Sequence, residues 1–137
     1  MSRKLKIQID QEEFEAITLD EAPKTVESFL KYLPFEGETY HAAWAGDSIV
    51  FRLPLDKVST VPAENQSIYG FAGDMIWFPR PTHHELQIVH GYAQFRWRTG
   101  PMVCNVFGRI LSRLPELNKV SETTRWEGLK KLRITAL

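Results

Sequence analysis

Apolar and polar residues alternate at the start of the chain. In Lys4–Ile9 the apolar side chains are Leu5, Ile7 and Ile9, which lie on one side of an extended segment. This period of two residues predicts a half-buried strand. A second strand is predicted for Phe14–Leu19 after a short turn, so the N-terminal segment is expected to form a β-hairpin.

The next apolar pattern has the period of a helix. Asp20 suits the cap position, and Pro23 suits the first turn, where no amide donor is needed. Pro34 is expected to end the helix, because the residue before a proline disfavours helical geometry. The apolar positions expected to face the core are Val26, Phe29, Leu30 and Leu33.

Short apolar runs bounded by turn-forming residues fill the middle of the chain. They are "ETYHAAWA", "DSIVFRL", "GDMIWF", "ELQIVHG" and "AQFRWR". Runs of this length and spacing predict strands, the first two joined by a hairpin turn at 45–47. The segment Pro54–Ser67 contains two prolines and mixed polarity, and it is expected to be a long loop.

A second, shorter helical pattern precedes the C-terminus, and Pro115 interrupts it. Its apolar positions are Ile110, Leu111, Leu114 and Leu117. The tail alternates at Leu132 and Ile134, which predicts a final strand. Many short strands with few helices predict a mainly β fold, a closed barrel capped by helices. A length of 137 residues favours one domain, 1–137.

Charge, cysteine content and apolar runs limit the kinds of partner and location that we expect. Seventeen basic residues balance 17 acidic ones, so no net field attracts nucleic acid or an anionic membrane. Cys104 is the single cysteine, which leaves no intramolecular disulfide. The N-terminus lacks the apolar core of a secretion signal, and no apolar run approaches the roughly 20 residues of a membrane span. We therefore expect a cytoplasmic protein without nucleic-acid or membrane partners.

Two segments resemble the cyclophilins. "EAPKTVESFLKYL" (Glu21–Leu33) is similar to the cyclophilin segment Ala-Pro-Lys-Thr-Val-x-x-Phe in the first helix. "NVFGRILSRLPELNKV" (Asn105–Val120) is similar to the Val-Phe-Gly-Arg-Val segment and the helix that follows it. The resemblance implies a cyclophilin-like closed β-barrel with one main helix and a second short helix.

The middle of the chain departs from the cyclophilins. Catalytic members carry Phe-His-Arg on the strand after the first helix, whereas this chain has "TYHAAW". With His41 at the histidine position, Ala42 stands where the catalytic arginine belongs. The chain instead resembles the small bacterial and archaeal cyclophilin-like proteins of the DUF3830 type. The matching residues are "YHAAWAGDSIVFRLP", Glu64–Asn65, "GFAGDMIWFP" and "NVFGRI". This resemblance implies a compact barrel with a cleft, and it supplies no established reaction.

Arginines near the predicted strands are candidates for holding a ligand. Arg96 and Arg98 share one face of "FRWR", and Phe95 and Trp97 share the other. A guanidinium can bind a carboxylate or an amide carbonyl through two hydrogen bonds. The alternative is an ordinary solvent-facing side of a strand. Arg96 is therefore predicted to bind the ligand.

Histidines and a carboxylate near residue 84 are candidates for acid–base chemistry. His83 or His84 beside Glu85 could exchange protons near neutral pH; the alternative is that they are loop residues in water. Neighbours on a strand point to opposite sides, and His84 and His90 would lie about 20 Å apart on an extended strand. The sequence therefore predicts no metal site.

Polar loop residues and aromatic residues complete the candidate ligand site. Glu64 and Asn65 could orient a polar ligand, or Asn65 could serve only to close a turn. The rings of Trp44, Trp77 and Tyr92 could line a pocket, although rings in short strands more often belong to the core.

The function expected from these residues is binding of, or action on, a small polar molecule with a carboxylate or amide in the barrel cleft. A classical prolyl isomerase is disfavoured by Ala42. A divergent peptidyl-prolyl isomerase, a proline-peptide-binding module and a non-catalytic subunit or scaffold remain as alternatives. No cofactor is predicted, and both enzymatic activity and homo-oligomer formation stay open.

Overall fold

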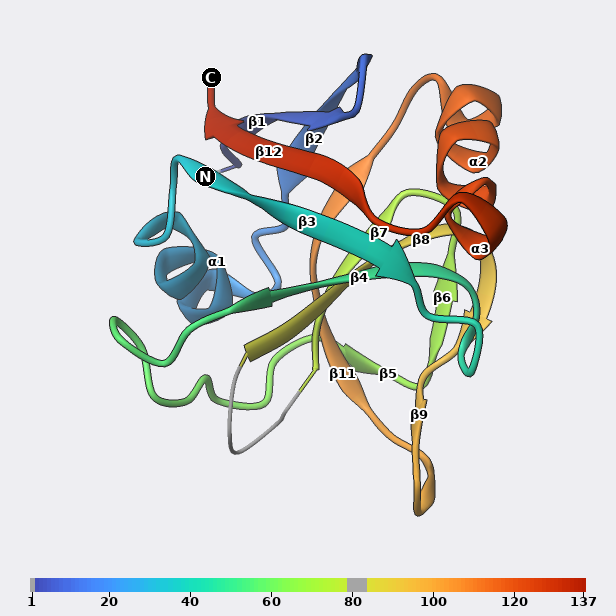
Figure 1. The fold of residues 1–137 in the computed structure, drawn as a ribbon. Coiled ribbons are helices and arrows are strands. Elements are labelled where there is room, and N and C mark those ends of the chain that lie inside the picture. Colours follow the sequence, from blue (N-terminus) through green and yellow to red (C-terminus); the bar gives the residue numbers. More distant parts are fainter. Residues whose placement is uncertain (1, 79–83) are drawn as a thin grey trace.

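A computed structural model of the chain describes residues 2–78 and 84–137 (Figure 1). His83 therefore lies outside the described residues. The main strands are β1 (Lys4–Ile9), β2 (Glu12–Thr18), β3 (Phe35–His41), β4 (Gly46–Leu53), β7 (Asp74–Phe78), β8 (His84–Gln94), β11 (Cys104–Ile110) and β12 (Lys130–Ala136). The short strands are β5 (Gln66–Ser67), β6 (Tyr69–Phe71), β9 (Arg96–Trp97) and β10 (Gly100–Pro101). The helices are α1 (Pro23–Leu30), α2 (Leu114–Glu122) and α3 (Thr124–Glu127).

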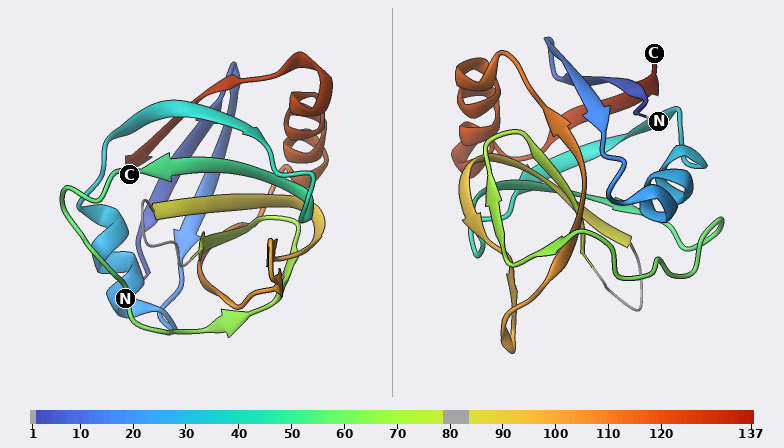
Figure 2. Two further views of the ribbon diagram at one scale, coloured as in Figure 1. Left: turned by 60° about the horizontal axis from the view of Figure 1, so that its bottom comes forward. Right: turned by 180° about the vertical axis from the view of Figure 1, so that it is seen from behind.

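Antiparallel pairing closes eight of the described strands into a barrel. Neighbours follow the order β2-β1-β12-β3-β4-β8-β7-β11, and β11 pairs back with β2 through Gly108 and Thr18. The predicted mainly β closed barrel is thus confirmed. Helix α1 lies on one side of the barrel, and α2 with α3 lies on the opposite side (Figure 2). With nine residues, α2 is no shorter than α1, which has eight.

The barrel interior is a packed core. The predicted inward residues of β1 and β12 are fully or almost fully buried there, which confirms the alternation in both strands. The largest inward side chains are Phe29, Phe51, Trp77 and Phe107. An eight-stranded barrel has an interior just wide enough for side chains to fill. A site for an organic ligand must therefore lie outside this packed core.

A second apolar cluster covers the outer face of β7 and β8. Ile76, Phe78 and Val89 point away from the lumen and pack against Phe95 and Cys104. Strand β7 is consequently buried on both faces, which explains why "DMIWF" lacks a regular polar alternation. The chain after β8 folds back over the barrel wall to provide this cover.

Some predicted boundaries were wrong. The cap residue of α1 is Ala22, not Asp20. Pro115 occupies the first turn of α2 instead of interrupting a helix, because the missing amide costs nothing there. Ile110 ends β11 instead of belonging to a helix. The runs "ELQIVHG" and "AQFRWR" are not two separate strands, since β8 continues to Gln94.

No helix in residues 2–78 and 84–137 has both the length and the apolar character needed to cross a membrane.

Candidate functional site

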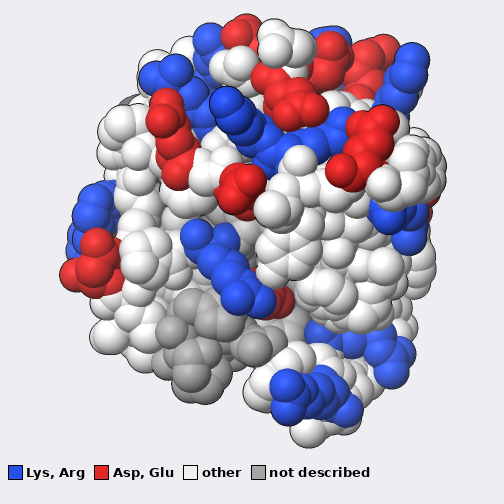
Figure 3. All heavy atoms as spheres, viewed as in Figure 1, with Lys and Arg blue, Asp and Glu red and all other residues white. Residues whose placement is uncertain are grey.

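A cleft of about 380 Å³ opens on the outer wall of the barrel. Its lining residues are Trp44, Arg52, Glu85, Arg96, Trp97 and Arg98. We call it the arginine cleft. Basic side chains gather over the β9 region in Figure 3, whereas both signs of charge mix over β3 and β12.

Strand register and two turns build the arginine cleft. Arg52 on β4 and Glu85 on β8 are cross-strand partners, so their side chains share one face of the sheet. Neighbouring Phe51 and Leu53 belong to the inner core, so that face is the outer one. Trp44 reaches the cleft from the turn between β3 and β4, and Arg96 reaches it from β9.

The side chains that line the arginine cleft differ in exposure. Glu85 is only 3% exposed, while Trp44 is 47% exposed. Arg96 donates from Nη1 to Gln94 Oε1 at 3.1 Å, and the Arg98 guanidinium lies 5.9 Å from the centre of the Trp97 ring. Three guanidinium groups around one carboxylate leave the cleft positive, which suits an anionic group of a ligand.

Gln87 adds a buried polar group to the same outer face of the wall. It follows Glu85 by two residues on β8, and its Oε1 accepts a hydrogen bond of 2.7 Å from Ser48 Oγ. Its Nε2 is buried and has no hydrogen-bond partner among the described residues. A buried amide donor without a partner is costly, and a bound molecule or water would satisfy it.

Sequence reasoning found only part of this cleft. Arg96, Trp44 and Glu85 were predicted site residues, whereas Trp97 was not. Trp97 was expected on the opposite side from Arg96 and Arg98. All three line the cleft because β9 is only two residues long and the chain turns immediately afterwards.

Neither Glu64 nor Asn65 lines the arginine cleft: Glu64 lies against α1, and Asn65 lies against β11. Glu64 Oε1 accepts from the amide of Lys24 at 3.1 Å, and Oε2 accepts from the amide and hydroxyl of Thr25 at 2.9 and 2.7 Å. Asn65 Nδ2 donates to Val106 O at 2.9 Å. Glu64 thus caps α1 from a distant loop, in place of the local cap expected at Asp20.

The pKa of Glu64 reflects this capping. Burial pushes the pKa upwards, but the hydrogen bonds from Thr25 and Lys24 outweigh burial and hold it below its usual value. A carboxyl group whose folded pKa is lowered stabilises the fold when ionised. The positive end of the α1 dipole favours the same charge.

Glu64→Gln is expected to lower the free energy of unfolding by about 1 kcal/mol at neutral pH, because the cap loses its charge. The stabilisation by Glu64 should be complete above the ordinary pKa of 4.5 and should vanish as pH falls through the lowered value. Urea unfolding of the native protein and of Glu64→Gln, repeated from about pH 7 to about pH 3, measures whether their free energies of unfolding become equal in acid. The exposed neighbour variant Glu21→Gln should change little, and a Glu64→Gln effect that persists unchanged in acid would contradict the capping role.

Other predicted site residues lie apart from one another. Trp77 is 2% exposed in the inner core. His84 is 2% exposed, packs 4.7 Å from the Trp77 ring centre, and bonds through Nε2 to the carbonyl oxygen of Val58. Tyr92 is exposed and stacks 6.1 Å from Tyr69. Of the candidates beside residue 84, Glu85 lines the arginine cleft, whereas His84 points into the core.

Two histidines that the sequence did not connect meet at the end of the barrel under α2. The Nε2 atoms of His41 and His90 are 3.0 Å apart. Burial lowers the pKa of both rings; for His90, the neighbouring His41 adds to the effect and its pKa falls to about 4. Both imidazoles are therefore neutral at neutral pH.

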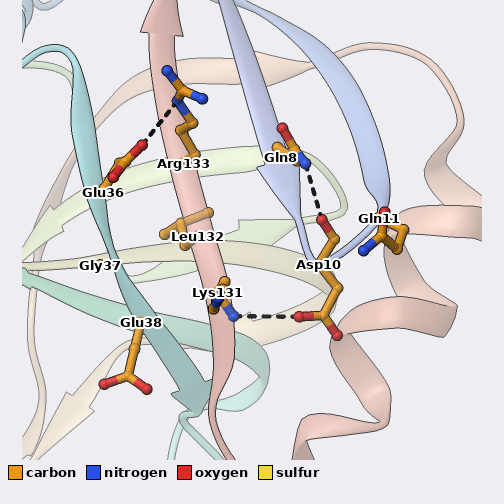
Figure 4. Close-up of a pocket in the computed structure, with 9 residues that line it drawn as sticks. All are labelled: Gln8, Asp10, Gln11, Glu36, Gly37, Glu38, Lys131, Leu132 and Arg133. Atoms are coloured by element: carbon orange, nitrogen blue, oxygen red, sulfur yellow. Dashed lines mark hydrogen bonds and ion pairs between the residues drawn. The ribbon is translucent and has the colours of Figure 1, made fainter.

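A polar groove of about 550 Å³ on the outer face of β1, β12 and β3 contrasts with the arginine cleft (Figure 4). Arg133 pairs with Glu36 at 3.3 Å, and Gln8 Nε2 donates to Asp10 O at 3.1 Å. The first is an ordinary cross-strand pair on a solvent-facing sheet, and the second is a local contact at the end of β1. None of the described residues that line the groove is aromatic, so they offer little to hold an organic ligand.

A family of known sequences matches nearly the whole chain. The sequence profile of the family described as "Protein of unknown function (DUF3830)" matches residues 7–136. The chain belongs to this family. The predicted resemblance to DUF3830 proteins is thereby confirmed, and the resemblance to the cyclophilins stays a prediction. No curated protein matches this DUF3830 chain in sequence.

Solved structures that share the fold of the DUF3830 chain include two proteins. McbB, solved in complex with tryptophan, superposes with a TM-score of 0.75 at 14% identity over 96% of this chain. The match covers 44% of McbB, so the chain spans less than half of that protein. The hypothetical protein AF2241 from Archaeoglobus fulgidus superposes with a TM-score of 0.64 at 19% identity, covering 99% of this chain and 95% of AF2241. At these identities the likeness concerns the fold alone.

Proposed function

We propose that this DUF3830 protein binds a small organic carboxylate that carries an aromatic ring, and that it does so in the arginine cleft. The observation that carries the proposal is the convergence of Arg52, Arg96 and Arg98 with Trp44 and Trp97 around one opening. The volume of about 380 Å³ lies within the roughly 300–1,000 Å³ typical of small-molecule sites.

Each kind of side chain in the arginine cleft matches one part of such a ligand. A guanidinium binds a carboxylate through parallel charge-assisted hydrogen bonds. The exposed ring of Trp44 offers a face on which an aromatic ring stacks. Glu85 adds a carboxylate that would attract an ammonium group, so an aromatic amino acid satisfies all three features. The tryptophan bound by McbB, a protein of the same fold, belongs to this chemical class.

Calorimetric titration with three related indoles tests the proposal. L-tryptophan has the ring, the carboxylate and the ammonium group; indole-3-acetate lacks the ammonium group, and tryptamine lacks the carboxylate. We expect binding of L-tryptophan and indole-3-acetate and much weaker binding of tryptamine, because the arginines recognise the carboxylate. Arg96→Ala and Trp44→Ala should each weaken L-tryptophan binding about tenfold or more.

The matched control is Arg133→Ala, which removes an arginine from the polar groove and should leave binding unchanged. Thermal unfolding of each variant checks that the fold persists. Equal affinity for tryptamine and L-tryptophan, or undiminished binding by a folded Arg96→Ala protein, would overturn the proposal. So would the absence of binding by all three compounds.

A further inference from the structure

A cluster of metal-ligating side chains lies at the end of the barrel covered by α2. It contains His41 at the end of β3, His90 on β8 and Glu122 at the end of α2. His90 Nε2 is 3.0 Å from His41 Nε2 and 3.9 Å from Glu122 Oε2. The three candidate ligand atoms all lie within 4.8 Å of one another. None of these residues lines the arginine cleft, so the inference is independent of the proposed carboxylate site.

Strand register brings the two histidines together. His41 pairs with Ile49 across β3 and β4, and Ile49 pairs with Ile88 across β4 and β8. Directly paired residues share a face of the sheet, and His90 follows Ile88 by two residues on that face. Ile49 and Ile88 belong to the inner core, so both imidazoles point inwards, where α2 closes the barrel.

The spacing of the two ring nitrogens suits metal coordination. With metal–nitrogen bonds of about 2.1 Å, two ligands separated by about 3.0 Å subtend roughly 90° at the metal, and a tetrahedral pair lies about 3.4 Å apart. The 3.0 Å between His41 and His90 thus fits adjacent positions of an octahedral site and needs only a small opening for a tetrahedral one. Glu122 is partly exposed, so its carboxylate has room to approach.

Charges around the cluster favour a cation. Arg125 Nε binds Glu122 Oε1 at 2.7 Å, so Oε2 is the carboxylate oxygen nearer His90. Arg125 also pairs with Asp47 Oδ1 at 3.0 Å. Two carboxylates therefore surround one guanidinium, which leaves a net negative charge beside the two imidazoles. Arg125 acts as a positioning residue for Glu122.

We propose that His41, His90 and Glu122 form a binding site for one divalent transition-metal ion, with zinc or cobalt as suitable probes. Two imidazoles and one carboxylate are a ligand set used for zinc and for ferrous iron, with the remaining positions open to water or substrate. Coordination by His90 Nε2 places the ring proton on Nδ1. Asn118 Nδ2 lies 3.0 Å from that atom and also donates to His90 O at 3.2 Å, so Asn118 would have to shift away from Nδ1 when the ion binds.

Titration of chelator-treated protein with zinc, and separately with cobalt, tests the site. We expect one ion per chain, a rise in melting temperature with zinc, and visible absorption bands with cobalt. His41→Ala and His90→Ala should each weaken zinc binding by more than about 100-fold, beyond the roughly 10–100-fold cost of losing a supporting partner. Glu122→Gln should weaken it about tenfold, and Glu127→Gln, a carboxylate outside the cluster, should not change it.

His41 is partly exposed, so His41→Ala is expected to fold even where His90→Ala does not. Circular dichroism verifies this before titration. Failure of the native chain to bind either ion stoichiometrically would overturn the proposal. Unchanged zinc affinity and unchanged cobalt bands in a folded His41→Ala protein would overturn it as well.

Discussion

Trp77→Ala is expected to lower the free energy of unfolding by about 4 kcal/mol, because it empties the largest side-chain volume in the barrel core. The indole is 2% exposed, and its ring centre lies 4.7 Å from that of His84 and 6.3 Å from that of Phe107. These neighbours belong to strands of the closed barrel, so they cannot collapse into the cavity without distorting hydrogen-bonded pairs.

Urea unfolding monitored by circular dichroism measures this loss, and thermal unfolding should show a fall on the order of 10 °C. Trp44→Ala is the matched control, since it removes the same side chain from a site that is 47% exposed. The control should leave stability nearly unchanged while weakening ligand binding in the arginine cleft. Comparable stability losses in the two variants would contradict the assignment of Trp77 to the core.

Asn105→Leu is expected to lower the free energy of unfolding by about 3 kcal/mol, although leucine has a similar volume. Asn105 is 4% exposed on β11. Its Nδ2 donates to Thr25 Oγ1 at 2.9 Å and to Pro62 O at 2.7 Å, and its Oδ1 accepts from the amide of Glu64 at 3.2 Å. Leucine removes all three hydrogen bonds from this part-buried site, and it also loosens the loop that presents Glu64 to α1.

Equilibrium unfolding of Asn105→Leu, compared with Gln66→Leu, tests this network. Gln66 is the exposed cross-strand partner of Asn105, so the control makes the same kind of change one strand away. We expect the control to shift stability by no more than about 0.5 kcal/mol. Combined with Glu64→Gln, Asn105→Leu should be non-additive, because both variants act on the cap of α1. Strict additivity would separate the two roles.

The barrel itself could be predicted from the sequence because burial acts locally on each strand. In β1 and β12, side chains that alternate between core and solvent leave a period of two in the sequence. Helix α1 was likewise visible from its apolar spacing and its prolines. The cap of α1 was not, because the carboxylate that provides it comes from Glu64, about 40 residues further along the chain.

The sites depended on information that no local pattern contains. Glu64 and Asn65 were predicted to be loop residues that could orient a ligand, but their hydrogen-bond partners lie on α1 and β11. Neighbouring side chains on a regular strand point to opposite sides, which predicted Arg96 and Trp97 on different faces. Strand β9 is only two residues long, so this alternation does not hold there. The metal expectation considered histidines along one strand, where their separation excluded a shared ion.

The sequence alone determined a closed, mainly β barrel of the DUF3830 family, because the periodicity of each strand and the family motifs can both be read from neighbouring residues in the sequence. Only the tertiary structure joined Trp44 and Arg52 to Arg96 in one cleft, and His41 to His90 and Glu122 at the end of the barrel. The physical reason is that pairing across β3, β4 and β8 sets which distant side chains meet. That register is fixed by packing of the whole barrel, not by any single segment.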